Sequence, residues 1–136
     1  GADVVKIAHQ KGIQVVPLVG PSSILMAMMS SGMNGQNFAF NGYIPIEQKQ
    51  RKMELKRLEK LSFDTGQSQL FIETPYRNDK MLQDIVSSVH ADTRICVACD
   101  ITLPTEFILT KPASYWKENM PNLHKRPAIF IIHKGL

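Results

Sequence analysis

Five apolar side chains follow one another without interruption between Pro127 and His133, and this run constrains the fold of the chain most. A short, continuously apolar run is typical of a strand that is buried in a sheet. Strands are also predicted over residues 13–19, 38–40, 68–72, 94–98 and 106–110. Helices are predicted over residues 2–11, 23–31, 47–61, 75–90 and 113–119. Strands that alternate with helices in this way indicate a single α/β domain.

The order of these elements predicts a mixed sheet of about five strands with helices on both faces. The strand–helix–strand order over residues 68–98 suggests a parallel pair. Residues 94–98 and 106–110 are separated by too little chain for a helical crossover, so these two strands are expected to be antiparallel.

The 136 residues suffice for one domain with a buried core, and 43% apolar with 21% charged residues is ordinary for a globular protein. No apolar run approaches the roughly 20 residues that a membrane-spanning helix needs. The first residues do not resemble a secretion signal, and only two cysteines are present, so the reducing cytoplasm is the expected location. Because the chain does not begin with Met, it is expected to start inside a longer protein or after processing.

The sequence Gly-Pro-Ser-Ser at residues 20–23 is a candidate binding site, because it joins a predicted strand to a predicted helix. Free backbone N–H groups at a helix N-terminus suit a carboxylate, a ribose or a phosphate. Alternatively, Ser22 simply caps the helix, as serine does in many proteins.

Glu73 and Arg77 follow directly after the strand predicted at residues 68–72. Residues at the carboxyl ends of strands face the crevice where α/β folds usually bind ligands. The two side chains are expected to lie near each other as a carboxylate–guanidinium pair. Alternatively, Glu73 complements the helix dipole and Arg77 is a solvated residue of the first turn.

Cys96 and Cys99 form a single C-x-x-C motif, a pattern that can mark redox or zinc sites. Within a strand their spacing sends the two sulfur atoms to opposite faces of the sheet. Structural cysteines are therefore expected. The four histidines show no ligand spacing either, so no metal site is predicted.

The helix predicted over residues 47–61 carries most of the chain's formal charge of +4. Six of its residues are basic and three are acidic: Lys49, Arg51, Lys52, Lys56, Arg57 and Lys60 against Glu47, Glu54 and Glu59. Such a helix can contact nucleic-acid phosphates. The alternative is a solvated helix face.

Several motifs, taken in order, resemble the tetrapyrrole methylase superfamily. Residues 12–23 are similar to its strand–turn–helix, GIQVVPLVGPSS in this chain. Residues 38–45, the basic helix after them, and residues 70–77, 102–110 and 126–132 look like one branch, the ribosomal RNA small-subunit methyltransferase I group. The resemblance runs over essentially the whole chain.

This resemblance implies an S-adenosylmethionine-dependent enzyme that 2′-O-methylates a cytidine of small-subunit ribosomal RNA, with a homodimer as the expected assembly. In the family an N-terminal domain completes the cofactor cleft, and by this comparison residues 1–136 form a C-terminal domain without it. Residue-wise matching gives these cofactor-binding candidates: Ser22, Ser23, Glu73, Ile101, Pro127 and Ala128. Glu73 and Arg77 are candidates for orienting the acceptor, whereas Arg51, Lys52, Lys56 and Arg57 are candidates for RNA contacts.

Two departures from the branch concern the acceptor. Residues 99–103 read Cys-Asp-Ile-Thr-Leu where the branch usually has Arg-Glu-Leu-Thr-Lys, and Tyr76 replaces a common His. The alternatives are therefore methylation of a tetrapyrrole or another small acceptor, or a non-catalytic binding domain that shares only the fold.

Overall fold

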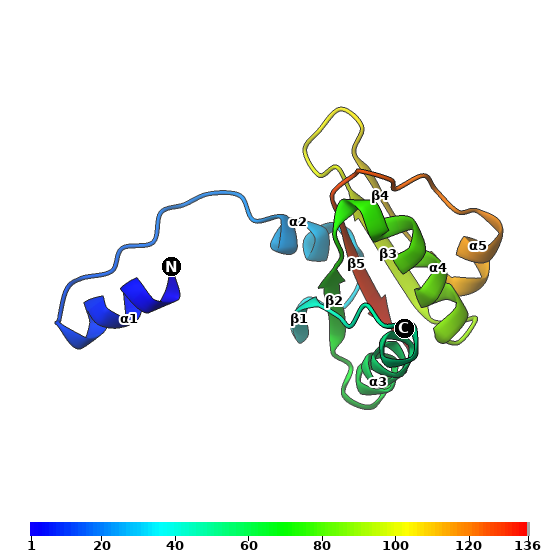
Figure 1. The fold of residues 1–136 in the computed structure, drawn as a ribbon, viewed down its shortest axis with the longest axis horizontal. Helices are drawn as coiled ribbons and strands as arrows, with labels where there is room; N and C mark the ends of the chain where they lie inside the picture. Colours follow the sequence, from blue (N-terminus) through cyan, green and yellow to red (C-terminus); the bar gives the residue numbers. More distant parts are fainter. Residues whose placement is uncertain (136) are drawn as a thin grey trace.

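The computed structural model describes residues 1–135 and contains one five-stranded sheet, in the order β1-β2-β5-β3-β4 (Figure 1). The strands are β1 (Phe38–Tyr43), β2 (Ser68–Ile72), β3 (Arg94–Cys99), β4 (Phe107–Pro112) and β5 (Ala128–His133). The helices are α1 (Ala2–Gln10), α2 (Ser23–Ser30), α3 (Gln48–Thr65), α4 (Asn78–Ser88) and α5 (Ala113–Glu118), with a 3-10 turn, η1 (Pro75–Arg77), before α4.

The sheet is mixed, as the sequence predicts. β1 and β2 are parallel and are joined through α3, whereas β3 and β4 form the expected antiparallel pair. The continuously apolar β5 lies between β2 and β3 and is antiparallel to both. β2 and β3 therefore run in the same direction without being neighbours, so the strand–helix–strand unit is not an adjacent pair.

Helices cover both faces of the sheet, which confirms the predicted layers. One face packs Leu58 of α3, Ile85 of α4 and Trp116 of α5 against Phe130 and its neighbours. The other face packs α2, through Met28, against a second set of strand side chains. Successive residues of one strand alternate between the two layers, so every position of β5 is buried.

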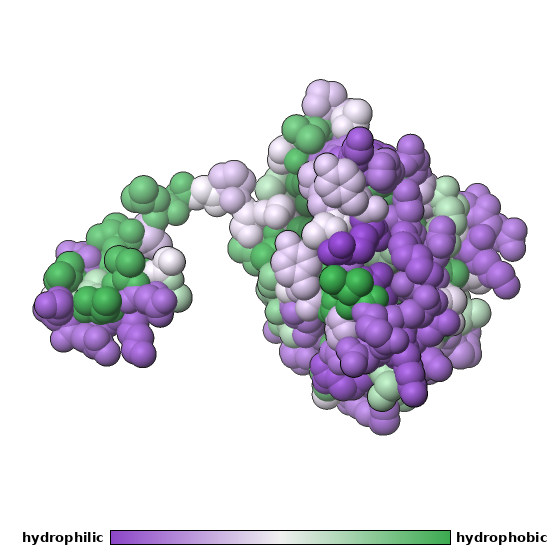
Figure 2. All heavy atoms as spheres, in the orientation of Figure 1, coloured by the Kyte–Doolittle hydropathy of each residue, from purple (hydrophilic) through white to green (hydrophobic). Residues whose placement is uncertain are grey.

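The prediction of a strand over residues 13–19 is wrong. These residues form no regular structure, and Leu18 and Val19 are almost fully exposed (Figure 1). α1, which precedes them, contributes no buried residue, and hydrophobic side chains lie open on its surface (Figure 2). A strand needs a neighbouring backbone to complete its hydrogen bonds, and the part of the chain that the structure describes pairs no strand with this segment.

Within residues 1–135, no helix has the length and apolar character needed to cross a membrane.

Candidate functional site

A cavity of about 410 Å³ lies at one edge of the sheet, beside the carboxyl ends of β2 and β3, the start of β5 and the start of α2. Five of the six residues proposed from the sequence for cofactor binding line it: Ser23, Glu73, Ile101, Pro127 and Ala128. These five residues come from four separate segments of the chain, which the fold gathers around one cavity. Its volume falls in the range of roughly 300–1,000 Å³ that is usual for small-molecule sites.

Ser22, the sixth proposed residue, does not line this cavity. It occupies the N-cap position of α2 with extended backbone angles, but its side chain makes no capping hydrogen bond. The hydroxyl group of Ser22 therefore does not cap the helix, and its contact with a cofactor stays a prediction. Ser23, the first residue of the helix, is the serine at the cavity.

Asp100 adds a carboxylate to the cavity that the sequence did not single out. Its Oδ2 accepts hydrogen bonds from Nε of Arg126 and from Oγ1 of Thr105, both at 2.8 Å. The hydrogen bond from Arg126, followed by that from Thr105, lowers the pKa of this carboxyl below its ordinary value. Asp100 and Thr102 also have positive φ angles, of 51° and 70°, so this loop holds an uncommon backbone conformation beside the cavity.

The depressed pKa of Asp100 makes a pH-dependent contribution to stability. Because the folded-state value lies below the unfolded value of about 3.9, this contribution is present above that pH and is lost as the pH falls through the folded value. Asp100→Asn should be less stable than the wild type from pH 5 to 8, and the difference should shrink below about pH 4. Urea denaturation across this pH range measures it. A difference that stays constant down to pH 2 would contradict the assignment.

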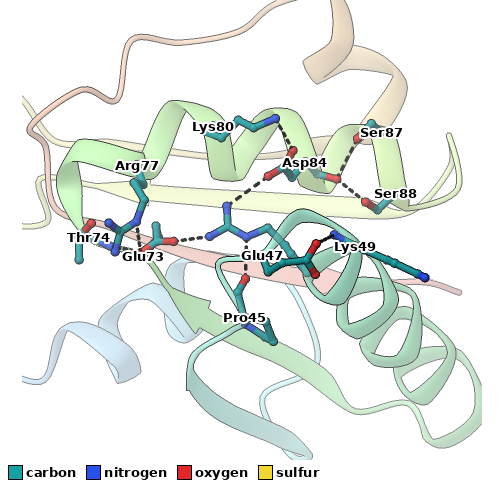
Figure 3. Close-up of polar contacts among 11 residues, drawn as sticks. Pro45, Glu47, Lys49, Glu73, Thr74, Arg77, Lys80, Asp84, Ser87 and Ser88 are labelled. Atoms are coloured by element: carbon teal, nitrogen blue, oxygen red, sulfur yellow. Dashed lines mark hydrogen bonds and ion pairs between the residues drawn. The ribbon is translucent and has the colours of Figure 1, made fainter.

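Glu73 is buried at the centre of a network of charged side chains (Figure 3). Its Oε1 faces Nε of Arg77 at 3.3 Å and accepts a hydrogen bond from the backbone N–H of Thr74 at 2.7 Å. This confirms the predicted pair of Glu73 and Arg77. Its Oε2 accepts from the guanidinium of Arg51, which reaches across from α3. Both oxygen atoms of Glu73 are therefore engaged within the protein.

Arg51 was predicted to contact RNA, and its position contradicts that prediction. Only 1% of it is exposed, because its guanidinium bonds Glu73, Oδ2 of Asp84 at 3.2 Å and the carbonyl oxygen of Pro45 at 2.9 Å. The sequence itself also indicates that Arg51 is buried. Arg51 stands four residues before Leu55 and seven before Leu58, and this spacing puts it on the buried face of α3.

The other basic residues of α3 stay on the surface. Arg57 is exposed but is paired with Glu54 at 2.6 Å, and its hydrogen bond lowers the pKa of the Glu54 carboxyl. Lys60 is paired with Asp64. Lys52 and Lys56 make no ion pair within residues 1–135. Lys49 makes none either, so within residues 1–135 the positive charge of α3 that no carboxylate pairs lies at these three lysines.

Cys96 and Cys99 are buried, unpaired in any disulfide, and lie on opposite faces of the sheet, as their spacing predicts. Burial raises the pKa of both thiols, which keeps them in the less reactive protonated form. Among the described residues there is no group of three or more His, Cys, Asp or Glu side chains that is arranged to hold a metal ion.

A second hollow, of about 590 Å³, adjoins the first. Glu73 lines both. The remaining walls come from the end of β1 and the segment after it, through Tyr43 and Ile46, and from the turn after β2, through Thr74 and Arg77. The predicted pair of Glu73 and Arg77 thus stands at the boundary between two neighbouring hollows.

The chain has sequence relatives among named methyltransferases. It is 29% identical over 136 residues to the ribosomal RNA small subunit methyltransferase I of Vibrio cholerae, which covers 98% of this chain and 46% of that protein. It is 27% identical to the protein of the same name from Escherichia coli O157:H7, over 99% of this chain and 48% of that one. The chain therefore spans about half the length of these relatives. No family model matches the sequence.

Solved structures with a similar fold include two named as methyltransferases. The methyltransferase CobJ superposes with a TM-score of 0.58 at 15% identity, over 94% of this chain and 55% of its own. Uroporphyrin-III C-methyltransferase from Thermus thermophilus, complexed with S-adenosylhomocysteine, superposes with a TM-score of 0.52 at 13% identity. The match covers 98% of this chain and 59% of that one. The chain is thus similar in sequence to proteins named ribosomal RNA small subunit methyltransferase I and similar in fold to methyltransferases of known structure.

Proposed function

We propose that the chain is part of an S-adenosylmethionine-dependent methyltransferase that 2′-O-methylates small-subunit ribosomal RNA. The observation that carries the proposal is the cavity at the sheet edge, around which Ser23, Glu73, Ile101, Pro127 and Ala128 converge. Ligands of α/β proteins usually bind at such strand ends. The names of the sequence relatives support ribosomal RNA as the acceptor.

The lining of the cavity suits S-adenosylmethionine, which joins a flat adenine to polar ribose and amino-acid groups. Much of the wall is apolar, including Ile24, Ile72 and Ile101. Polar groups stand among these side chains, and Oδ1 of Asp100 receives no hydrogen bond within residues 1–135. Pro127 and Ala128 would flank the adenine. The bound cofactor supplies an activated methyl group.

In this proposal Glu73 positions other groups and does not accept a proton from the acceptor. Both of its oxygen atoms are already engaged. One accepts a hydrogen bond from Arg51, and the other accepts one from the backbone N–H of Thr74 and faces the guanidinium group of Arg77. Arg77 is held by Glu73 at the cavity boundary, where it can orient the acceptor. The rate enhancement then comes mainly from proximity and orientation of the methyl group and the acceptor oxygen.

The proposal also includes a preceding domain that supplies the other wall of the cleft. The exposed apolar residues of α1 and of the segment after it, among them Val4, Leu18 and Val19, support this part. Large apolar side chains that are exposed in such numbers usually contact another protein surface. The family resemblance further predicts a homodimer in the cytoplasm. Light scattering on the longer protein measures whether it is a dimer.

Residues 1–136 alone are expected to bind S-adenosylmethionine weakly or not at all, because they provide one wall of the cleft. The longer protein should bind it and transfer a methyl group to small ribosomal subunits. Titration calorimetry compares the two affinities, and incorporation of labelled methyl groups measures transfer. Micromolar affinity of the isolated chain would contradict the divided site. Failure of the longer protein to methylate small subunits would remove RNA as the acceptor.

A further inference from the structure

The hollow beside the cofactor cavity has the side chains that a nucleotide needs. We infer that it binds one unstacked nucleotide of single-stranded RNA, with the base stacked on Tyr43 and a phosphate bonded by Arg77. This inference rests on the proposed function and assigns the acceptor side of the site to particular residues. Proteins read single-stranded RNA mainly by stacking bases on aromatic side chains and by bonding phosphates with basic groups.

Tyr43 is placed as a stacking platform by the backbone of β1. The register of β1 against β2 shifts between Phe40 and Tyr43, and Gly42 between them has a φ angle of +65°. Such an irregularity changes the direction in which the next side chain points. Tyr43 is left 66% exposed at the rim of the hollow, while the next residue, Ile44, is buried below it.

Arg77 is placed as a phosphate ligand by its ion pair with Glu73. The shortest contact of the pair is made by Nε, at 3.3 Å, and the guanidinium of Arg77 donates no side-chain hydrogen bond within residues 1–135. The side chain is 43% exposed. A guanidinium that lies beside a buried carboxylate, is partly exposed and keeps its hydrogen-bond donors unused is suited to bond the oxygen atoms of a phosphate.

The two hollows share Glu73, so a nucleotide in the second lies next to a cofactor in the first. α3 begins two residues after Ile46, another residue of this hollow, and its first turns carry Lys49 and Lys52. A strand of RNA that leaves the hollow along this helix meets positive charge. This arrangement favours a nucleic acid over an isolated small acceptor.

The test uses the longer protein and small ribosomal subunits. Tyr43→Ala should raise the KM for subunits by roughly tenfold or more, whereas Tyr43→Phe, which keeps the ring, should stay close to wild type. Neither should change the affinity for S-adenosylmethionine. The control is Phe63→Ala, because Phe63 is an aromatic residue with 60% exposure that lines neither hollow.

Arg77→Met should flatten the dependence of log affinity on log salt by about 0.7, the value for one phosphate contact on a single strand. Lys117→Met, on the exposed side of α5, should leave the slope unchanged.

Two outcomes overturn different statements. If the wild type methylates small subunits but Tyr43→Ala behaves like Phe63→Ala, the nucleotide subsite is wrong and the proposed function stands. If the wild type methylates a tetrapyrrole and not RNA, and Tyr43→Ala reduces that activity, both the RNA acceptor and the nucleotide subsite are wrong.

Discussion

Replacing Arg51 with Met is expected to lower the free energy of unfolding by roughly 3–5 kcal/mol, the usual effect of removing one partner from a buried ion pair. Met has a similar length, so the change removes the charge and leaves little empty space. The carboxylates of Glu73 and Asp84 are both buried and would each lose a guanidinium partner. A loss of this size is a large fraction of the roughly 5–15 kcal/mol that stabilises a typical domain.

Urea denaturation of the wild type and the variant measures this loss. Arg57→Met is the matched control, because Arg57 lies on the same helix and is also paired, but with a side chain that is 60% exposed. The control should lose at most about 1 kcal/mol. Adding Glu73→Gln to Arg51→Met should cost less than the sum of the two single changes, since the neutral amide no longer needs the lost partner. If Arg51→Met and Arg57→Met lower the free energy of unfolding equally, burial does not determine how much an ion pair contributes to stability.

The sequence predicts the parts of this fold that depend on local pattern. The strands at residues 68–72 and 94–98 appear within one residue of their expected bounds, because apolar runs of this length fit a sheet interior. The pair of Glu73 and Arg77 was also predictable, since a strand end and a spacing of four bring the two side chains together.

The missed features depend on contacts between distant parts of the chain. Arg51 is separated by 22 residues from Glu73 and by 33 from Asp84, and Arg126 by 26 from Asp100. No local pattern specifies such partners. The wrong strand at residues 13–19 has the same origin, because an apolar run shows that a segment favours burial and does not show which surface buries it.

Reversing the charge of Lys52 and Lys56 together is expected to weaken binding of small ribosomal subunits by at least tenfold near 0.1 M salt. These lysines are four residues apart on one face of α3 and make no ion pair within residues 1–135. Each phosphate contact contributes about 0.7–0.9 to the slope of log affinity against log salt. The variant Lys52→Glu/Lys56→Glu should therefore lose about 1.4–1.8 from that slope.

Arg57 gives the structural contrast on the same helix. Glu54 neutralises it locally, so Arg57→Glu should weaken binding less than Lys56→Glu, although a charge-based reading of the sequence treats the two alike. The measurement is methyl transfer and subunit binding over a salt series, with Lys117→Glu as a control for net charge. If all three single reversals have the same small effect, α3 responds only to the overall charge of the protein. If Lys56→Glu acts strongly and Lys117→Glu does not, the RNA follows the face of α3 that continues from the Tyr43 hollow.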